Sequence, residues 1–316
     1  MQKPLKILVV RFSSIGDIVL TTPVVRVLKK ELNAEVHFIT KDIFKSVVSH
    51  NPYIDKIHTI KSSVKEIIEE IKEEKFDWII DLHNNLRSAQ LKRIMVKSKS
   101  YNKLNFRKFL LTNFGMNILP KSHTVDRYLD TISHLGAKND GLGLDYFLSK
   151  EDEIEVPHSE KPFITFAIGG THFTKILPTA KIISICNKQE KQVILIGGKE
   201  DFEKGEEIAE SCKNVINTCG KYTINQSAYI VKNSDLLITH DTGMMHIAAA
   251  FNMKIYSVFG GTHPSLGFTP YLPNSGNKII EVENLSCRPC HRFGKSSCPK
   301  GHFKCMNLID ENLFTE

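Results

Sequence analysis

Short apolar runs alternate with segments of helical periodicity along the first half of the chain. Ile7–Val10 is a continuous apolar run, which is typical of a strand buried on both faces of a parallel sheet. Apolar positions then recur at helical spacing from about Ile18 to Leu32, with Pro23 within the first turns. Further elements are expected in the order strand Glu35–Thr40, a short helix to about Ser49, strand Lys56–Ile60, helix Val64–Glu74 and strand Trp78–Leu82. This alternation predicts parallel strands joined by helical crossovers.

The same alternation returns in the second half. Strands with helices between them are expected at Phe163–Ile168, Val193–Ile196, Val215–Asn217, Leu236–Thr239 and Ile255–Phe259. Between the halves, the stretch from Lys150 to Pro162 is acidic, contains two prolines and has no apolar period, which is typical of a linker. The pattern therefore predicts an α/β protein of two doubly wound parallel-sheet domains, residues 1–155 and residues 156–316.

Composition excludes several classes of protein. The 316 residues are 41% hydrophobic and 24% charged, which argues against a disordered chain. No run approaches the roughly 18 apolar residues of a membrane span, and the first residues lack the apolar stretch of a secretory signal. Seven cysteines, an odd number, argue against a disulfide framework in a chain without such a signal. We therefore expect a cytoplasmic location.

The net charge of +7 is unevenly distributed. No acidic residue occurs between Asp81 and Asp126, and this basic interval carries nine cations: Arg87, Lys92, Arg93, Lys97, Lys99, Lys103, Arg107, Lys108 and Lys121. All nine would belong to the first domain. They form either a solvated surface or a platform for an anionic partner such as phosphate, nucleic acid or an acidic membrane.

The loop after the first strand contains one candidate catalytic group. Ligands bind beyond the carboxyl ends of the strands in doubly wound sheets, so the residues that follow each strand are candidates. Here Ser14, Gly16 and Asp17 follow, with neither a Gly-x-Gly-x-x-Gly fingerprint nor a phosphate-binding Gly-Lys-Ser/Thr. Gly16 permits close approach of a ligand. Asp17 either caps the following helix or acts as a general base.

The loops of the second domain predict a bound diphosphate. After the strand Leu236–Thr239, Asp241 and Thr242 can cap a helix on which His246 lies one turn further on. Gly243 exposes backbone N–H groups at the helix N-terminus, which suits a phosphate. Thr171 and Lys175 follow another strand. Of the acidic residues Glu200, Asp201 and Glu203, which could each accept hydrogen bonds from ribose hydroxyls, we select Asp201.

These motifs carry a family resemblance. Ser13-Ser-Ile-Gly-Asp17 with Thr22-Pro23, then Lys175-x-x-Pro178 and Asp241-Thr-Gly-x-x-His246, resemble the bacterial heptosyltransferases of glycosyltransferase family 9. The resemblance covers nearly the whole chain. It implies a GT-B fold, in which two Rossmann-like domains face a cleft, and the inverting transfer of heptose or a related sugar from an ADP-sugar to the lipopolysaccharide core.

The resemblance also implies roles for individual residues. Asp17 is the expected general base. The donor would contact Lys175, Thr171, Asp201, Asp241, Thr242, Gly243 and His246, and the acceptor Ser14 and Gly16. Because the resemblance places the acceptor in the first domain, the charge of the basic interval adds Arg87, Arg107 and Lys108 to its expected contacts. We expect no catalytic metal, since the sequence has no Asp-x-Asp, and no required cofactor. The partners would be the nucleotide sugar and an anionic lipid-linked saccharide, reached from the inner face of the cytoplasmic membrane, without nucleic acid.

Two other functions remain open at this stage. One is a sugar-nucleotide epimerase, which also places two nucleotide-type domains around a cleft. The other is a non-catalytic nucleotide or nucleic-acid binder with a zinc module. That module would use Cys287, Cys290, Cys298 and Cys305, whose spacing is compatible with a structural Zn²⁺, with His291 and His302 as competing ligands. Alternatively, these cysteines are reduced and pack a terminal loop.

Overall fold

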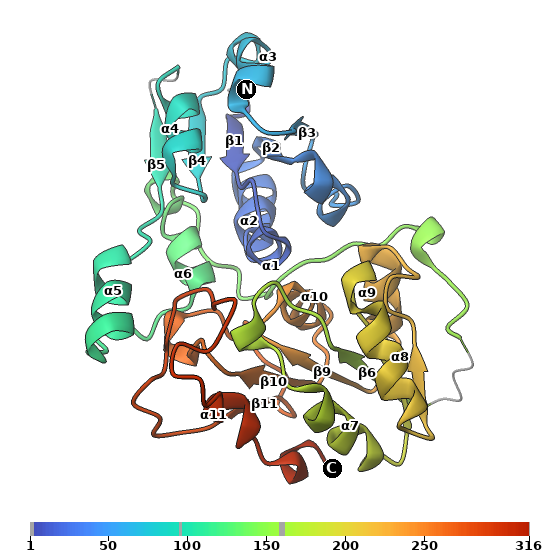
Figure 1. Cartoon of the computed structure of the whole chain (residues 1–316). Helices are drawn as coiled ribbons and strands as arrows, with labels where there is room; N and C mark the ends of the chain where they lie inside the picture. Colours follow the sequence, from blue (N-terminus) through green and yellow to red (C-terminus); the bar gives the residue numbers. More distant parts are fainter. Residues whose placement is uncertain (1–2, 95–96, 158–161, 316) are drawn as a thin grey trace. The chain divides into compact units, whose positions relative to one another are not determined.

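The computed structural model describes residues 3–94, 97–157 and 162–315. The chain divides into two compact units, each built around a parallel sheet (Figure 1). Unit 1 comprises Met1–Lys103 and Ser122–Phe147, and unit 2 comprises Leu104–Lys121 and Leu148–Glu316. Of the predicted linker, Lys150–Asp152 form a 3-10 turn, and residues 158–161 lie outside the described part of the chain.

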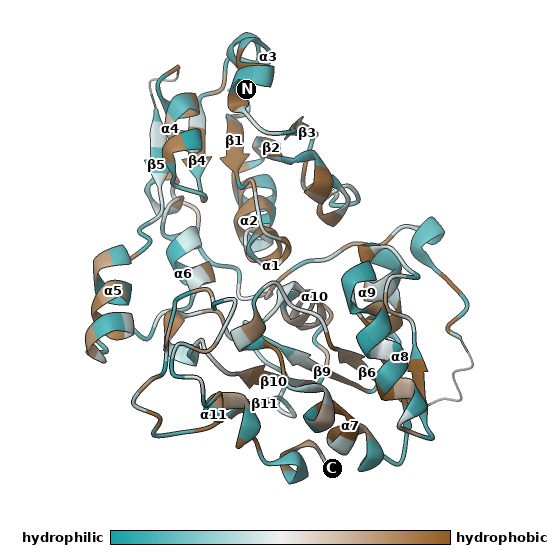
Figure 2. Ribbon diagram, viewed as in Figure 1, coloured by the Kyte–Doolittle hydropathy of each residue, from teal (hydrophilic) through white to brown (hydrophobic). Residues whose placement is uncertain are grey.

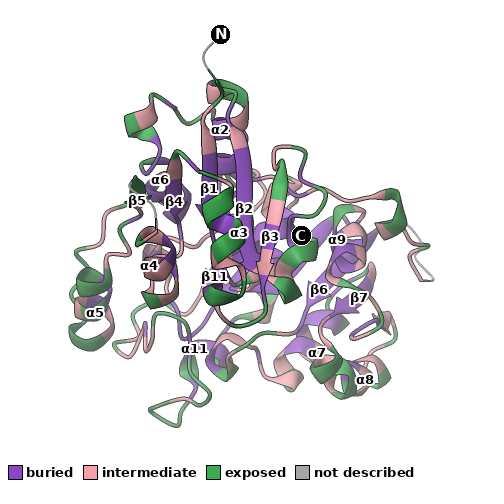
Figure 3. Cartoon of the chain, turned by 90° about the horizontal axis from the view of Figure 1, so that it is seen from above, coloured by how far each residue is buried: buried purple, intermediate pink, exposed green. Residues whose placement is uncertain are grey.

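The sheet of unit 1 has the strand order β3-β2-β1-β4-β5, with every pairing parallel. Its strands are β1 (Lys6–Val10), β2 (Glu35–Lys41), β3 (Lys56–Ile60), β4 (Trp78–Asp81) and β5 (Ser98–Ser100). Figure 3 shows β1 and β2 buried along most of their length, as their apolar runs predict. The helices of this unit are α1 (Ile15–Val19), α2 (Thr22–Leu32), α3 (Ile68–Glu73), α4 (Leu86–Lys92) and α6 (Thr124–Leu129).

The single helix predicted over Ile18–Leu32 is wrong, because the chain breaks between α1 and α2. Pro23 lies in the first turn of α2 and has no N–H with which to continue a helix from α1. At the break, the hydroxyls of Thr21 and Thr22 donate to the carbonyls of Ile18 and Val19, at 2.6 and 2.8 Å. Similarly, the predicted helix Val64–Glu74 consists of a 3-10 turn, Val64–Ile67, followed by α3.

The sheet of unit 2 has the order β11-β10-β9-β6-β7-β8 and is also parallel throughout. Its strands are β6 (Phe163–Ala167), β7 (Gln192–Ile196), β8 (Val215–Asn217), β9 (Leu236–His240), β10 (Ile255–Phe259) and β11 (Lys278–Glu281). The helices are α5 (Asn105–Phe114), α7 (Thr179–Asn187), α8 (Phe202–Glu210), α9 (Ile224–Lys232), α10 (Gly243–Ala250) and α11 (Lys304–Asn307). Phe303, Met306 and Phe314, near the end of the chain, complete the apolar core.

Every strand expected from the sequence is present, but β5 and β11 were not anticipated. Both lie at sheet edges, where a strand has only one neighbour. β5 has the sequence Ser-Lys-Ser and β11 the sequence Lys-Ile-Ile-Glu, so neither shows a long apolar run. Short strands with charged residues are a common form of sheet edge, and they carry little periodicity signal.

Each sheet has a topological switch point, where the order of the strands reverses. In unit 1 it lies between β1 and β4, and in unit 2 between β6 and β9. Loops that leave neighbouring strands in opposite directions open a crevice at this point, where ligands bind in doubly wound sheets. The architecture therefore directs attention to the residues after these four strands. Within the described residues, no helix has both the length and the apolar character of a membrane span.

Candidate functional site

Asp17 lies at the switch point of unit 1, as the third residue of α1. Its Oδ2 accepts hydrogen bonds from the backbone N–H and the hydroxyl of Ser14, at 3.4 and 3.0 Å. Its Oδ1 forms an ion pair with Nη2 of Arg11 at 2.7 Å. The side chain keeps 25% of its accessible surface. Asp17 therefore caps α1, and the same carboxylate is held in a fixed orientation at the sheet edge.

Arg11, which sequence reasoning missed, fixes that orientation. Its guanidinium donates to the carbonyls of Leu82 and Ser13, at 2.6 and 2.7 Å, and to the hydroxyl of Tyr128 at 2.9 Å. Burial works against the charged form, but Asp17 and Tyr128 outweigh it and raise the pKa of Arg11 above its usual value. An arginine directly after a buried apolar strand was the available signal.

His83 is a second residue of this region that was not anticipated. It follows β4 and packs edge-to-face against Phe12, with the ring centroids 5.1 Å apart. Burial and the charge of Arg11 lower the pKa of His83 to about 4, so the imidazole is neutral at pH 7. Its Nδ1 is buried and has no hydrogen-bond partner among the described residues. Its position after the strand Trp78–Leu82 could have identified it.

At the switch point of unit 2, Lys175 and Asp241 form an ion pair, with Nζ and Oδ2 2.8 Å apart. The two residues come from the loops after β6 and β9. The hydroxyl of Thr262 donates to the same carboxylate oxygen at 2.8 Å. The expectation that Asp241 caps the next helix is wrong, because its carboxylate turns to Lys175 and Thr262 instead.

The N-terminus of α10 lies beside this ion pair in the sequence. Thr242 is the N-cap residue, but its side chain makes no capping hydrogen bond and lies 3.3 Å from the hydroxyl of Thr239. Gly243 begins the helix, and His246 is buried one turn further along. Thr171 is exposed in the loop after β6. Lys175, Asp241, Thr242 and Gly243 thus meet at one edge of the sheet.

Asp201 turns inward, whereas Glu200 and Glu203 are exposed. Its Oδ2 accepts a hydrogen bond from the backbone N–H of Gly198 at 2.8 Å. A Cβ on Gly169 would lie 2.2 Å from this oxygen, so only glycine permits the carboxylate to approach the loop after β6. Burial raises the pKa of Asp201. The structure therefore separates one inward carboxylate from two solvated ones.

Two further groups lie near the ends of these strands. His240, the last residue of β9, accepts a hydrogen bond at Nε2 from the backbone N–H of Leu177 at 3.0 Å. Burial, together with Lys204 and Lys175, lowers the pKa of His240 to about 3. Lys204 on α8 donates to the carbonyl of Leu177 at 3.3 Å, and burial lowers its pKa. Lys204 adds a cation that sequence reasoning missed, because it lies within an ordinary amphipathic helix.

The nine cations of the basic interval do not lie in one domain, contrary to expectation. Arg87 is on α4 in unit 1, where its guanidinium lies 5.7 Å from the centre of the Phe12 ring. Arg107 and Lys108 are on α5, which belongs to unit 2. Arg107 is exposed, whereas Lys108 is buried and lies over the ring of Phe268 at 5.0 Å. Lys108 is therefore not part of a solvated surface.

The cysteine-rich segment, which carries Cys287, Cys290, Cys298 and Cys305, packs against the loop that contains Lys175. The backbone N–H and the hydroxyl of Thr174 donate to the carbonyl of Lys295 at 3.1 and 3.3 Å, and the Lys295 N–H donates to the Thr174 hydroxyl at 2.7 Å. Gly261 donates its N–H to the carbonyl of Thr174 and accepts the N–H of Cys290. Cys287, Cys290, Cys298 and Cys305 are all free thiols. Burial raises the pKa of Cys305 to about 11. Across the described ranges, no three sulfur or histidine ligand atoms of this segment lie within 4.8 Å of one another.

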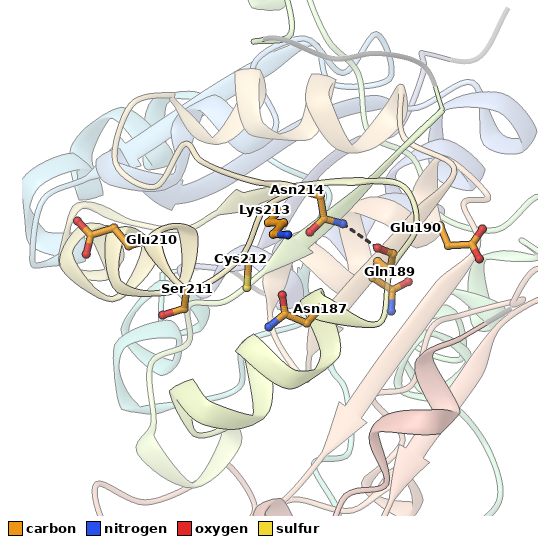
Figure 4. Close-up of a pocket in the computed structure, with 8 residues that line it drawn as sticks. All are labelled: Asn187, Gln189, Glu190, Glu210, Ser211, Cys212, Lys213 and Asn214. Carbon is orange, nitrogen blue, oxygen red and sulfur yellow. Dashed lines mark hydrogen bonds between the residues drawn. The ribbon is translucent and has the colours of Figure 1, made fainter.

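A surface pocket of about 530 Å³ lies at the amino ends of strands of the unit 2 sheet (Figure 4). It is lined by residues at the ends of α7 and α8, among them Asn187, Gln189, Cys212 and Asn214. The Asn214 amide donates to the carbonyl of Gln189 at 2.7 Å. These residues precede β7 and β8, so the pocket lies at the amino ends of the strands, away from Lys175 and Asp241.

Known proteins resemble this chain both in sequence and in fold. The chain is 24% identical to lipopolysaccharide heptosyltransferase 1 of Campylobacter coli over 310 residues, which cover 88% of this chain and 90% of the relative. The crystal structure of a family 9 glycosyl transferase from Veillonella parvula matches with a TM-score of 0.72 and 22% identity, covering 88% of this chain and 86% of that one. The E. coli heptosyltransferase WaaC with ADP matches with a TM-score of 0.68 and 18% identity, covering 87% and 92%.

These structures share two parallel α/β sheets with this chain, which confirms the GT-B fold. The family itself is matched over residues 64–300, which include the Lys175 and Asp241 loops as well as most of the cysteine-rich segment. Since this match spans well over half of the sequence, the chain belongs to glycosyltransferase family 9, the heptosyltransferase family.

Proposed function

We propose that this glycosyltransferase moves heptose, or a closely related sugar, from an ADP-sugar onto the lipopolysaccharide core with inversion. The observation that carries the proposal is the placement of the family motifs. Asp17 lies at the switch point of one sheet, and Lys175 and Asp241 lie at the switch point of the other. A base and an anion-binding group thus each occupy the ligand-binding edge of a Rossmann-like unit.

In this proposal, Asp17 accepts the proton of the attacking acceptor hydroxyl. Ser14 and Arg11 hold the carboxylate in one orientation, so little reorganisation accompanies the transfer. The acceptor oxygen then bonds to the anomeric carbon, and the bond from that carbon to the diphosphate breaks.

The departing diphosphate requires positive charge and hydrogen-bond donors. Lys175 supplies a cation, and it can release Asp241 because that carboxylate retains the hydroxyl of Thr262. The uncapped N-terminus of α10 supplies backbone N–H groups, which stabilise a developing negative charge. These groups would serve in place of a metal ion. Asp201, the inward carboxylate, accepts hydrogen bonds from the ribose hydroxyls of the donor in this proposal.

The acceptor is an anionic, lipid-linked saccharide at the inner face of the cytoplasmic membrane in this proposal. Support comes from α5 and the residues after it, which present an apolar outer face. Phe106, Phe109 and Phe114 are 70%, 52% and 64% exposed, while Lys108 is buried. Figure 2 shows hydrophobic residues alternating with hydrophilic ones along α5. A helix with aromatic residues outside and Arg107 beside them suits the boundary between lipid tails and anionic headgroups.

Membership of family 9 favours a transferase over the epimerase and the nucleic-acid binder. The structural zinc at Cys287, Cys290, Cys298 and Cys305 stays a prediction. Metal analysis of protein purified without chelator, compared with the variant Cys287→Ser, measures whether these thiolates contribute to bound zinc.

A donor screen tests the proposed function. Purified protein is incubated with ADP-heptose, ADP-glucose or UDP-N-acetylglucosamine, with and without a heptose-free lipopolysaccharide core, and products are identified by mass spectrometry. We expect ADP release and a heptose-sized mass increase of the core only when ADP-heptose and core are both present. Conversion of the nucleotide sugar without core to an isomer of equal mass, separated by chromatography before mass spectrometry, would replace the proposal with an epimerase.

A further inference from the structure

We propose that unit 1 contains a binding site for a divalent transition-metal ion of the zinc type, formed by His37, His58 and Glu74 and separate from Asp17. Each of the three residues has one candidate ligand atom that lies within 4.8 Å of those of the other two. Both histidines are only 2% exposed. The proposed transferase chemistry uses none of them.

The fold places the two histidines on one face of the sheet. His58 on β3 pairs with Ile39 on β2, and Ile39 points to the same face as His37, two residues earlier. Nδ1 of His37 and Nε2 of His58 face each other at 2.9 Å. Two nitrogen ligands of one tetrahedral Zn²⁺ at about 2.0–2.1 Å lie about 3.3 Å apart. The imidazoles therefore need to separate by only a few tenths of an ångström.

The two ring nitrogens that face each other are the inner nitrogens, and the other nitrogen of each ring is the outer one. The hydrogen bonds of the outer nitrogens determine whether the inner nitrogens carry a proton or a lone pair. Nε2 of His37 lies 3.0 Å from a carboxylate oxygen of Glu35, and Nδ1 of His58 lies 2.9 Å from one of Glu70. A carboxylate only accepts hydrogen bonds, so both outer nitrogens carry protons. In neutral imidazoles the two inner nitrogens then present lone pairs to each other. This contact is repulsive unless a cation lies between them.

A metal ion between the two inner nitrogens meets this requirement. Histidine ligands of metals commonly donate their other N–H to a carboxylate, and both histidines do so here. Phe76 packs edge-to-face on His37 at 5.0 Å and closes the apolar side.

Glu74 completes the set without leaving its neighbours unpaired. It forms ion pairs with Lys6 and with Lys56. Each lysine has a second carboxylate, since Lys6 lies 3.1 Å from Glu35 and Lys56 lies 3.1 Å from Glu70. One oxygen of Glu74 can therefore turn to a metal. Such an ion would join β2, β3 and the end of α3.

The experiment uses the full chain, stripped with a chelator and titrated with Zn²⁺ and, separately, with Co²⁺. Calorimetry gives stoichiometry and affinity, and the spectrum of bound Co²⁺ identifies its ligands. We expect one equivalent with visible d–d bands and no thiolate charge-transfer band, which distinguishes this site from the cysteines. His58→Gln should abolish that equivalent, and Glu70→Gln should weaken it about 10–100-fold. His50→Gln, an exposed histidine in the same unit, should bind as the wild type does.

Glu74→Gln, which alters a partly exposed ligand, is a second test if His58→Gln does not fold, and circular dichroism checks folding of each variant. We expect at least a tenfold weaker Zn²⁺ affinity. Equal affinity in the wild type, His58→Gln and Glu74→Gln would overturn the proposal. So would a wild type whose bound Co²⁺ shows only thiolate ligation, and in that case the imidazoles share a proton instead.

Discussion

Asp17 receives contacts from Ser14 and Arg11, and each residue constrains a different oxygen of its carboxylate. Ser14 contacts Oδ2, Arg11 contacts Oδ1, and the side chain keeps 25% of its accessible surface. Arg11 is itself tied to Leu82 and Tyr128. A buried cation anchored in this way positions the carboxylate.

Asp17→Asn should lower turnover by a factor of about 10²–10⁴, because an amide cannot accept the acceptor proton. Initial rates of transfer to the core measure this effect, and ADP affinity should be nearly unchanged. Asp42→Asn is the control, since Asp42 is an exposed residue at the start of the 3-10 turn Asp42–Val47. A folded Asp17→Asn protein with near-normal turnover would exclude Asp17 as the base.

Lys175→Ala should weaken ADP binding by about 1.5–3 kcal/mol, because a charge-assisted bond to the diphosphate is lost. Calorimetric titration with ADP measures the change. The double variant Lys175→Ala/Asp241→Asn removes the repulsion from an unpaired Asp241, so the loss that persists belongs to the lysine. Lys191→Ala is matched to it, since Lys191 pairs with Asp235 at 3.0 Å near the amino ends of the strands. Equal ADP affinity in all variants would place the donor elsewhere.

At the scale of elements, short turns fix the ends of the longer segments. The 3-10 turn Val64–Ile67 begins where Glu66 accepts the backbone N–H groups of Lys61, Ser62 and Ser63, at 2.8, 3.0 and 2.7 Å. These bonds lower the pKa of Glu66 from its usual 4.5 to about 2. A carboxylate that is easier to ionise in the folded state stabilises that state when it is ionised.

The Glu66 contribution should be fully present above pH 4.5 and disappear as the pH falls to about 2. Glu66→Gln should therefore be less stable than the wild type at pH 7, and the two should converge in acid. Urea unfolding midpoints from pH 7 to pH 2 measure this. Glu69→Gln, which removes an exposed carboxylate paired with Lys72, is the control for the loss of a surface charge in the same segment. A constant difference between Glu66→Gln and wild type at all pH values would contradict the assignment.

The α5 helix should provide the apolar part of membrane binding. Phe109→Ser/Phe114→Ser should lower affinity for anionic vesicles at least tenfold, since burying one phenylalanine is worth about 1.5–3 kcal/mol. Vesicle sedimentation measures it. Phe202→Ser, on α8 of the same unit and 41% exposed, is the control and should bind as the wild type does. Equal binding by the double variant would show that α5 does not enter lipid.

The net charge of +7 acts at the scale of the whole molecule. Attraction of cations to anionic lipid is worth about 1 kcal/mol per residue close to the surface and is screened over about 8 Å at physiological salt. Vesicle binding should therefore be strong at low ionic strength and decline toward about 0.15 M salt. Arg107→Glu should weaken vesicle binding at low salt, make its decline with salt shallower, and raise the KM for the acceptor, with the donor KM unchanged. Binding that is independent of salt, or equal to neutral vesicles, would refute this electrostatic component.

The strands and the ligand-binding loops could be predicted from the sequence because they depend on local pattern. An apolar run such as Ile7–Val10 is buried whichever strands it pairs with. Alternating strands and helices give a parallel sheet, in which the carboxyl ends of all strands lie on the same side. Asp17, Lys175 and Asp241 were therefore found as neighbours of strand ends. The edge strands β5 and β11 escaped prediction, because one-sided pairing demands no apolar run.

Only the tertiary structure decided which of these side chains meet. The Lys175–Asp241 ion pair, the anchoring of Asp17 by Arg11 and the facing imidazoles of His37 and His58 join residues from different strands and loops. Lys108 is buried and α5 belongs to unit 2, although both lie in a sequence interval that reads as a basic surface. Local periodicity specifies how one segment is exposed, whereas pairing, burial and charge compensation depend on which distant segments the sheet order brings together.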